Sequence, residues 1–259
     1  MSVLVVMPTY NERENVAAVL NAVRESIPGA DILVVDDNSP DGTAKLVNET
    51  SEALGRIDLL QRPGKQGLGS AYREGFRIAI ERGYDAVVSM DVDLSHDPAV
   101  ILEMIRLLEA GADAVIGSRY VPGGATVDWP LHRRVLSRWG NRYTSRVLGL
   151  PIRDCTSGFR AYRGDALARI DTGSTTAEGY AFLTELVRRL VRDGSRVAET
   201  PIVFTDRRHG TSKMSGRIVV ESMLLVTRWG LGDLFNRLAG RGDGAARTDR
   251  GAAAPRGNT

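Results

Sequence analysis

The sequence is poor in cysteine and lacks a long apolar run, and each shortage excludes a class of protein. Cys155 is the only cysteine among 259 residues, which excludes an intramolecular disulfide and a zinc site built from several thiolates. The most apolar stretch, Ile218 to Phe235, is interrupted by Glu221, Arg228 and Asp233, so it does not form an uninterrupted membrane span. The opening residues, MSVLVVMPTYNERE, carry no basic leader and too short an apolar run for a signal peptide. We therefore expect a protein of a reducing compartment that does not cross a bilayer by itself.

The charges nearly balance but are unevenly distributed along the chain. There are 34 lysines and arginines against 32 acidic residues, yet nine arginines and only two aspartates fall between Arg119 and Arg163. Arginine without lysine suits bidentate binding of phosphate or contact with anionic lipid. A nucleic-acid surface is the alternative, but the acidic remainder of the chain and the lack of a nucleic-acid-binding motif oppose it. We expect no nucleic-acid partner.

Apolar runs alternate with helical patterns over the first 120 residues. The runs VLVVMP, DILVVDD, IDLLQR, DAVVSMD and ADAVIGS have the composition of buried strands, and helical patterns follow Asn11, Asp41, Gly67 and Asp97. Continuous valine, isoleucine and leucine runs separated by helices are typical of a parallel sheet covered on both faces. The sequence therefore predicts an α/β fold with an open, twisted, mainly parallel sheet, whose ligands bind at the carboxyl ends of the strands.

The regular alternation of strand and helix patterns ends after Arg119. Helical patterns run through HRRVLSRWGNRYTSRVLG, from about 178 to 192 and from about 217 to 238, and SRVAETPIVF has the pattern of a late strand. The last helix carries Trp229 and Phe235, so it either lies in a membrane interface or packs against the core. Residues 239–259 are rich in glycine, alanine and arginine, and we expect them to be disordered. Residues 1–238 are then expected to form a single domain.

Four polar sets follow the predicted strands, and the topology would bring them to one crevice: Pro8 to Glu12, Asp36 with Asp37, Asp91 to Asp93, and Gly117 to Arg119. Asp91 and Asp93 are two carboxylates at the end of a buried run, and a divalent cation between them would relieve their repulsion. A simple turn or helix cap is the alternative for this pair. Asp36 and Asp37 suit a ribose hydroxyl or a base edge, or else cap the next helix. The glycines from Gly64 to Gly69 lack the spacing of a phosphate loop and indicate a turn.

These residues resemble a specific enzyme family. The segments MPTYNERENV, VVDDNSPDGT, GLGSAYREGF, MDVDLSHDP, IGSRYVPGG, HRRVLSRWGN, DCTSGFRAYR and RRHGTSKM are similar to polyprenyl-phosphate (dolichol-phosphate) mannose synthases. That family consists of inverting glycosyltransferases of family 2 with the GT-A fold, and the resemblance covers residues 3 to about 230. It implies transfer of mannose from GDP-mannose to a polyprenyl monophosphate with Mg²⁺ or Mn²⁺. It also implies a cytoplasmic protein, peripheral on the cytosolic face of a membrane, whose membrane anchor is borrowed from a separate protein.

The resemblance also implies roles for individual residues. The guanosine part of the donor would lie against Pro8, Tyr10, Glu12, Val35 and Asp37. Its ribose, diphosphate and metal would be held by Asp91, Val92 and Asp93. The phosphates would meet Arg119, Arg207 and Lys213, and the acceptor phosphate would meet Arg119, Arg133 and Ser137. Asp91, Asp93 and Arg119 are then the expected catalytic residues, and Ser95 stands where the family often has a glutamine ligand to the metal.

The implied chemistry needs no strong base, because a lipid phosphate is already anionic and attacks the sugar in line. Metal, arginine and lysine would stabilise the departing GDP, and the loop from Arg207 to Lys213 would close over the site. Two other functions stay open at this point: a polyprenyl-phosphate glucosyltransferase that uses UDP-glucose, and a regulator that binds nucleotide sugars without catalysis.

Overall fold

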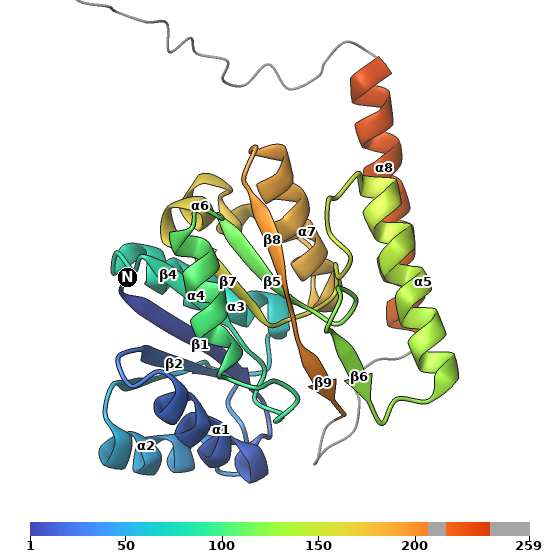
Figure 1. Ribbon diagram of the computed structural model, residues 1–259. Helices are drawn as coiled ribbons and strands as arrows, with labels where there is room; N and C mark the ends of the chain where they lie inside the picture. Colours follow the sequence, from blue (N-terminus) through green and yellow to red (C-terminus); the bar gives the residue numbers. More distant parts are fainter. Residues whose placement is uncertain (207–215, 239–259) are drawn as a thin grey trace, which may run out of the picture.

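The computed structural model describes residues 1–206 and 216–238 and arranges their helices around a central sheet (Figure 1). The first half of the chain forms β1 (Val3–Thr9), α1 (Arg13–Ser26), β2 (Asp31–Asp36), α2 (Thr43–Leu54), β3 (Ile57–Gln61), α3 (Leu68–Glu81), β4 (Ala86–Ser89), α4 (Val100–Glu109) and β5 (Ala114–Ser118). The second half forms β6 (Ala125–Val127), α5 (Leu131–Leu148), β7 (Arg160–Arg163), α6 (Gly164–Arg169), the 3₁₀ turn η1 (Thr172–Ser174), α7 (Gly179–Arg192), β8 (Val197–Pro201), β9 (Val203–Thr205) and α8 (Gly216–Leu238). The predicted strands and helices are confirmed. The predicted tail, 239–259, lies outside the described residues.

The central sheet has seven strands in the order β3-β2-β1-β4-β7-β5-β8. β7 runs antiparallel to β4 and β5, and every other neighbouring pair is parallel. The mainly parallel sheet is therefore as predicted. Arg160, the first residue of β7, pairs with Ser89, the last residue of β4. The loop before β7 consequently lies at the same edge of the sheet as the residues that follow β4.

Both faces of the sheet are covered because side chains alternate along each strand. Val5 and Met7 of β1 pack on the side of α1, α2 and α4, whereas Leu4 and Val6 pack on the side of α3, α6 and α7. On the second face, α3 lies close to β1 at Gly75, where an added Cβ would lie 2.3 Å from Val6 Cγ1. Two separate apolar layers thus hold the sheet rigid beneath its carboxyl edge.

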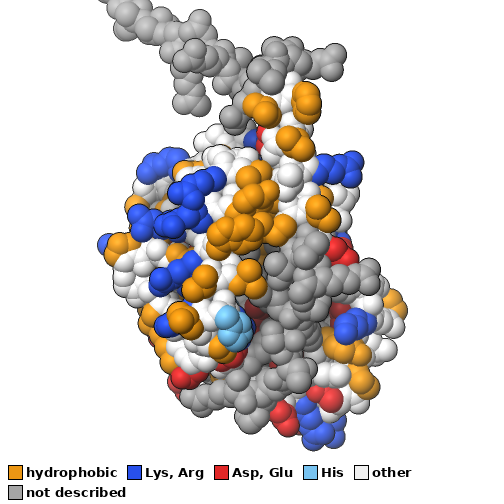
Figure 2. Space-filling model, turned by 90° about the vertical axis from the view of Figure 1, so that its right-hand side faces the viewer, with side chains coloured by type: hydrophobic (Ala, Val, Ile, Leu, Met, Phe, Trp, Pro, Cys, Tyr) orange, Lys and Arg blue, Asp and Glu red, His pale blue; other side chains and the backbone are white. Residues whose placement is uncertain are grey.

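The helices α5 and α8 lie side by side at one edge of the molecule (Figure 1). Their contact is close at Gly230, where an added Cβ would be 2.4 Å from Val147 Cγ1. Tyr143 Oη and Thr227 Oγ1 share a hydrogen bond of 2.7 Å across the same interface. Figure 2 shows hydrophobic side chains gathered on the face that carries these helices, with lysine and arginine beside them. Within the described residues, no helix has the length and hydrophobicity to cross a membrane.

Candidate active site at the carboxyl edge of the sheet

Asp36, the last residue of β2, and Asp37, which follows it, have different surroundings. Asp36 is fully buried and accepts hydrogen bonds from Thr9 Oγ1 at 2.7 Å and Ser39 Oγ at 2.6 Å. Thr9 pairs with Asp36 in the parallel register of β1 and β2. Asp36 therefore joins the turn after β2 to the end of β1. The helix that follows, α2, has Gly42 as its N-cap and no side-chain cap hydrogen bond, so Asp36 does not have the capping role that the sequence offered as one alternative.

Asp37 holds the glycine-containing loop that precedes α3. Its Oδ2 atom accepts backbone N–H groups of Gln66 and Gly67, each at 3.1 Å, and its carboxylate pairs with the buried Arg62. Lys65 of the same loop lies 4.2 Å above the ring of Tyr10. The loop is a turn that ends at the N-cap of α3, as predicted. The loop also contacts Tyr10 and Asp37, the two residues of this loop's surroundings that are expected at the guanosine end of the donor.

Asp91 and Asp93 lie within four residues of the end of β4 and line one cavity. Asp91 Oδ1 accepts a hydrogen bond of 3.2 Å from Tyr72 Oη, and Asp93 Oδ1 accepts one of 3.1 Å from the backbone N–H of Ser95. Burial, and then the charge of Asp91, raise the pKa of Tyr72 well above its ordinary value. The phenol therefore stays protonated and donates to the carboxylate.

The cavity has a volume of about 140 Å³ and lies between the sheet edge and the helices α5, α7 and α8. Its polar wall brings together five of the predicted site residues: Asp91, Asp93, Arg119, Arg133 and Ser137. Its apolar wall includes Leu136, Ala181, Met223 and Val226, which come from these three helices. The cavity lining thus combines charged groups with side chains suited to hydrocarbon.

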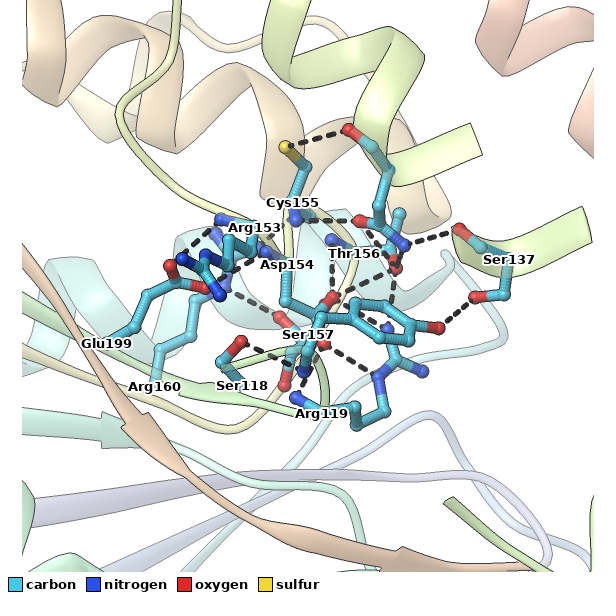
Figure 3. Close-up of polar contacts among 12 residues, drawn as sticks. Ser118, Arg119, Ser137, Arg153, Asp154, Cys155, Thr156, Ser157, Arg160 and Glu199 are labelled. Atoms are coloured by element: carbon cyan, nitrogen blue, oxygen red, sulfur yellow. Dashed lines mark hydrogen bonds and ion pairs between the residues drawn. The ribbon is translucent and has the colours of Figure 1, made fainter. Parts of the chain in front are cut away.

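Arg119 is buried and held by Asp154. Its Nε and Nη2 atoms donate to the two carboxylate oxygens of Asp154, each at 2.7 Å, and Nη2 also donates to Thr156 Oγ1 at 2.7 Å. Burial alone would raise the pKa of Asp154, but the charge and hydrogen bonds of Arg119 outweigh it, and the pKa lies below its ordinary value. The pair is therefore ionised, and the guanidinium keeps one orientation at the cavity wall (Figure 3).

Arg133 and Ser137 lie one turn apart on α5 and reach the same cavity. Arg133 Nη1 donates to Asp206 Oδ2 at 2.9 Å, and its guanidinium carbon lies 3.9 Å from the ring centre of Trp129. Ser137 Oγ and Tyr120 Oη are 2.6 Å apart. Both side chains have defined neighbours, so α5 presents them in a fixed position.

Six of the other predicted residues do not line this cavity. In the part of the chain that the structure describes, Pro8, Tyr10, Glu12, Val35, Asp37 and Val92 are not among the cavity-lining residues. Pro8 pairs with Val35 in the β1–β2 register, and Asp37 donates its backbone N–H to Thr9 O at 3.0 Å, so these residues cluster at the neighbouring strand ends. Arg207 and Lys213 lie outside the described residues. The expected base site is thus adjacent in the sheet to the expected metal site.

The carboxylate oxygens of Asp91 and Asp93 are suitable ligands for a hard divalent cation. Two carboxylates contribute oxygen ligands, and such ions bind protein oxygen and keep several waters. The hydroxyl of Ser95 is buried and has no hydrogen-bond partner in the described part of the chain. No third histidine, cysteine or acidic side chain joins the two carboxylates in a cluster among residues 1–206 and 216–238. The residues present therefore fit a cation that is completed by substrate and water.

Some residues of the site were not predicted. Asp154 holds Arg119 and Tyr72 holds Asp91, and each partner is distant in sequence. Trp129 and Phe204 form an aromatic wall whose ring centres are 5.5 Å apart. Asp154 and Trp129 lie in the arginine-rich segment 119–163, where few aspartates and tryptophans stand among nine arginines, and this contrast was the available signal.

Comparison with known proteins agrees with this geometry. Residues 4–171 match the family described as Glycosyl transferase family 2. The chain is 44% identical over 238 residues to the polyprenol monophosphomannose synthase of Mycolicibacterium smegmatis, covering 92% of this chain and 90% of that protein. It is 46% identical over 243 residues to the undecaprenyl-phosphate mannosyltransferase of Micrococcus luteus, covering 93% and 99%. The chain belongs to glycosyltransferase family 2, and it is a glycosyltransferase.

Solved structures share the fold. A mannosyltransferase from Pyrobaculum calidifontis, in complex with GDP-mannose and Mn²⁺, superimposes with a TM-score of 0.57 at 18% identity over 94% of this chain and 76% of that one. A glucosyl-3-phosphoglycerate synthase from Mycobacterium tuberculosis, bound to Mn²⁺, UDP-glucose and phosphoglyceric acid, gives 0.62 at 19% identity over 88% and 80%. These likenesses establish the predicted GT-A architecture.

Proposed function

We propose that the chain transfers mannose from GDP-mannose to a polyprenyl monophosphate, with inversion, giving polyprenyl-phosphate β-mannose and GDP. The observation that carries the proposal is the cavity in which Asp91 and Asp93 share a wall with Arg119, Arg133 and Ser137. Two relatives at 44 and 46% identity are named as enzymes that form mannosylated polyprenyl phosphates, which supports the same acceptor class here.

The donor would occupy the carboxyl edge of the sheet. Asp91 and Asp93 would hold a divalent cation, Mg²⁺ or Mn²⁺, which neutralises charge on the departing diphosphate when bound. The neighbouring strand ends, with Tyr10 and Asp37, would take the guanosine. The loop that Asp37 fastens carries Lys65, so a cationic side chain already lies beside the expected base position.

The acceptor would enter the cavity from the side of α5 and α8. Arg119 and Arg133 are positive groups suited to its phosphate, and Ser137 offers a hydroxyl within the same wall. The apolar wall formed by Leu136, Met223 and Val226 suits the first prenyl units. A lipid phosphate oxygen held there attacks the anomeric carbon from the face opposite the diphosphate, which gives inversion without a general base.

The proposed location is the cytosolic surface of a membrane, with a separate protein as anchor. Leu131, Val135 and Trp139 of α5 are exposed, as are Leu231 and Phe235 of α8. Exposed apolar side chains beside arginines are typical of helices that lie in a lipid interface. The face shown in Figure 2 is therefore the surface that we assign to the membrane.

The test is transfer of radiolabelled mannose to a polyprenyl phosphate in detergent with Mg²⁺ or Mn²⁺. We expect product from GDP-mannose and not from UDP-glucose, and loss of about 100-fold or more in rate for Asp93→Asn, because electrostatic stabilisers of a leaving group contribute on that order. Asp97→Asn is the matched control, since Asp97 lies in the same loop and its carboxylate caps the N–H of Ala99. Product from UDP-glucose alone would refute the donor assignment. Binding of GDP-mannose without transfer would favour a regulator.

A further inference from the structure

A short loop before β7, residues 153–158, connects the arginine of the cavity to the buried core (Figure 3). Asp154 has no exposed surface and contacts Arg119 through both carboxylate oxygens, each at 2.7 Å. The backbone N–H of Arg119 also donates to Asp154 Oδ2 at 3.1 Å. Both the main chain and the side chain of Arg119 are therefore positioned by one carboxylate.

The carboxylate itself is fixed by its own loop. Asp154 Oδ1 accepts backbone N–H groups from Ser157 at 3.1 Å and Thr156 at 3.3 Å. On the other side, Glu199 of β8 accepts the N–H of Arg153 at 2.8 Å and of Asp154 at 3.0 Å. The loop thus has a set conformation that does not depend on Arg119 alone.

Two further side chains fasten the loop to the helices. Arg160 is fully buried and donates to the carbonyl oxygens of Ser157 at 2.6 Å, Cys155 at 2.8 Å and Leu183 at 2.6 Å. Asn141 of α5 accepts the N–H of Cys155 at 2.7 Å. These contacts join β7, α5 and α7, so the loop that carries Asp154 is held from three elements.

We infer that Asp154 is a positioning residue for the transfer reaction, fixing the Arg119 guanidinium for the acceptor phosphate, and this inference rests on the proposed function. Contact through Nε and Nη2 fixes the guanidinium plane and directs its Nη1 atom away from Asp154. An arginine that is already oriented loses less conformational freedom when phosphate binds. A displacement of about 1 Å of such a group costs about 100-fold in rate.

The first experiment compares Asp154→Asn with wild-type protein, using farnesyl phosphate as a short acceptor. We expect the KM for farnesyl phosphate to rise about 10- to 100-fold, because the amide presents an N–H toward the guanidinium and releases it. The Kd for GDP-mannose, measured by calorimetry, should change less than the acceptor KM, since the hydrogen bonds of the Asp154 carboxylate to described residues go to Arg119 and to its own loop, not to the strand ends proposed for the guanosine. Asp113→Asn is the control, because Asp113 also accepts a backbone N–H and pairs with an arginine, Arg169, but lies at the opposite end of β5 from Arg119.

A double-mutant cycle then distinguishes positioning of Arg119 from a general loss of structure in the variant. If Asp154 acts through Arg119, adding Asp154→Asn to Arg119→Ala leaves the acceptor KM unchanged from that of Arg119→Ala alone. Additive losses, or an equal loss in Asp113→Asn, would overturn the inference. Should Asp154→Asn fail to fold, Thr156→Val removes another acceptor of Arg119 Nη2 and should raise the acceptor KM about fivefold.

Different experimental results would refute the proposed function and the role of Asp154. Wild-type protein without mannose transfer to farnesyl or longer polyprenyl phosphates would refute the proposed function. Active wild-type protein with an unchanged acceptor KM in Asp154→Asn and in Thr156→Val would leave that function intact and refute the role of Asp154.

Discussion

At the scale of single residues, the hydroxyl of Tyr72 fixes one of the two carboxylates proposed to hold the metal. It donates to Asp91 Oδ1 at 3.2 Å, and its ring is buried against Phe76 and Phe182. We expect Tyr72→Phe to weaken the apparent Mg²⁺ or Mn²⁺ affinity about tenfold, because partners behind a metal ligand contribute on that order. The measurement is a metal titration of transfer activity.

The matched control for Tyr72→Phe is Tyr84→Phe. Tyr84 Oη donates to Asp31 at 2.9 Å, at the end of β2 away from the site. The control loses one phenol hydroxyl without a change at Asp91. An equal change in metal affinity in both variants would contradict a specific role for Tyr72.

Cys155 gives a second prediction at this scale, because its thiol is buried. Burial raises the pKa of Cys155 to about 12. Because the raised pKa keeps the thiol protonated, its thiolate fraction at pH 8 is about a thousandfold lower than in an unfolded chain. We expect negligible reaction with a disulfide reagent at pH 8 and complete reaction in urea. Rapid labelling of the folded protein would contradict this burial.

Site residues that are marked by their own local sequence pattern could be predicted from the sequence. Asp91 and Asp93 were predicted from their spacing after an apolar run, and both line the cavity. Asp154 and Tyr72 were missed because their importance depends on partners 35 and 19 residues away. A lone aspartate in a turn carries no sign of the arginine that it will meet. Such pairs are fixed only when the strands are placed in the sheet.

At the scale of elements, the packing of α3 on β1 depends on Gly75. A Cβ at this position would lie 2.3 Å from Val6 Cγ1, and Val6 is fully buried. We expect Gly75→Ala to lower the free energy of unfolding by about 1–3 kcal/mol, the usual cost of overpacking a core. Urea denaturation measures it. Gly29→Ala is the control, because a Cβ there meets nothing within 4 Å; an equal loss in the control would contradict the packing argument.

The sequence indicates short strand character in DCTSGFRAYR, and β7 confirms it, but the sequence could not give the place of this strand in the sheet. Its four residues, Arg160–Arg163, include two arginines, so they lack the apolar run that marked the parallel strands. Its position between β4 and β5 is set by pairing with both neighbours, and Arg160 is satisfied by carbonyl groups rather than by solvent. The parallel strands were predictable because their burial is continuous. The antiparallel strand needed long-range pairing.

At the scale of the whole molecule, the charged and apolar surfaces are arranged around one entrance. Leu136 of α5 lines the cavity and is also 49% exposed. The apolar wall of the cavity is therefore continuous with the face formed by α5 and α8. An acceptor that is part lipid and part phosphate would pass along this face with its tail in the membrane and its phosphate toward Arg119 and Arg133.

This arrangement predicts that membrane binding and catalysis are separable. Leu231 and Phe235 are 52% and 69% exposed on α8. We expect the double substitution Leu231→Glu and Phe235→Glu to reduce binding to phosphatidylglycerol vesicles about tenfold or more, since each apolar side chain that enters the interface contributes about 1.5–3 kcal/mol. Transfer to farnesyl phosphate in detergent should be unchanged, because neither residue lines the cavity.

Vesicle sedimentation measures the binding, and Leu102→Glu is its control. Leu102 is 55% exposed on α4, away from the α5 and α8 face, so its replacement should leave sedimentation unaltered. The exposed arginines of α5, such as Arg138 and Arg142, add a second expectation. Binding should weaken as salt is raised, because ions screen their attraction to anionic lipid, and it should be weaker on phosphatidylcholine. Equal binding by the double variant and wild type would place the membrane contact on another face.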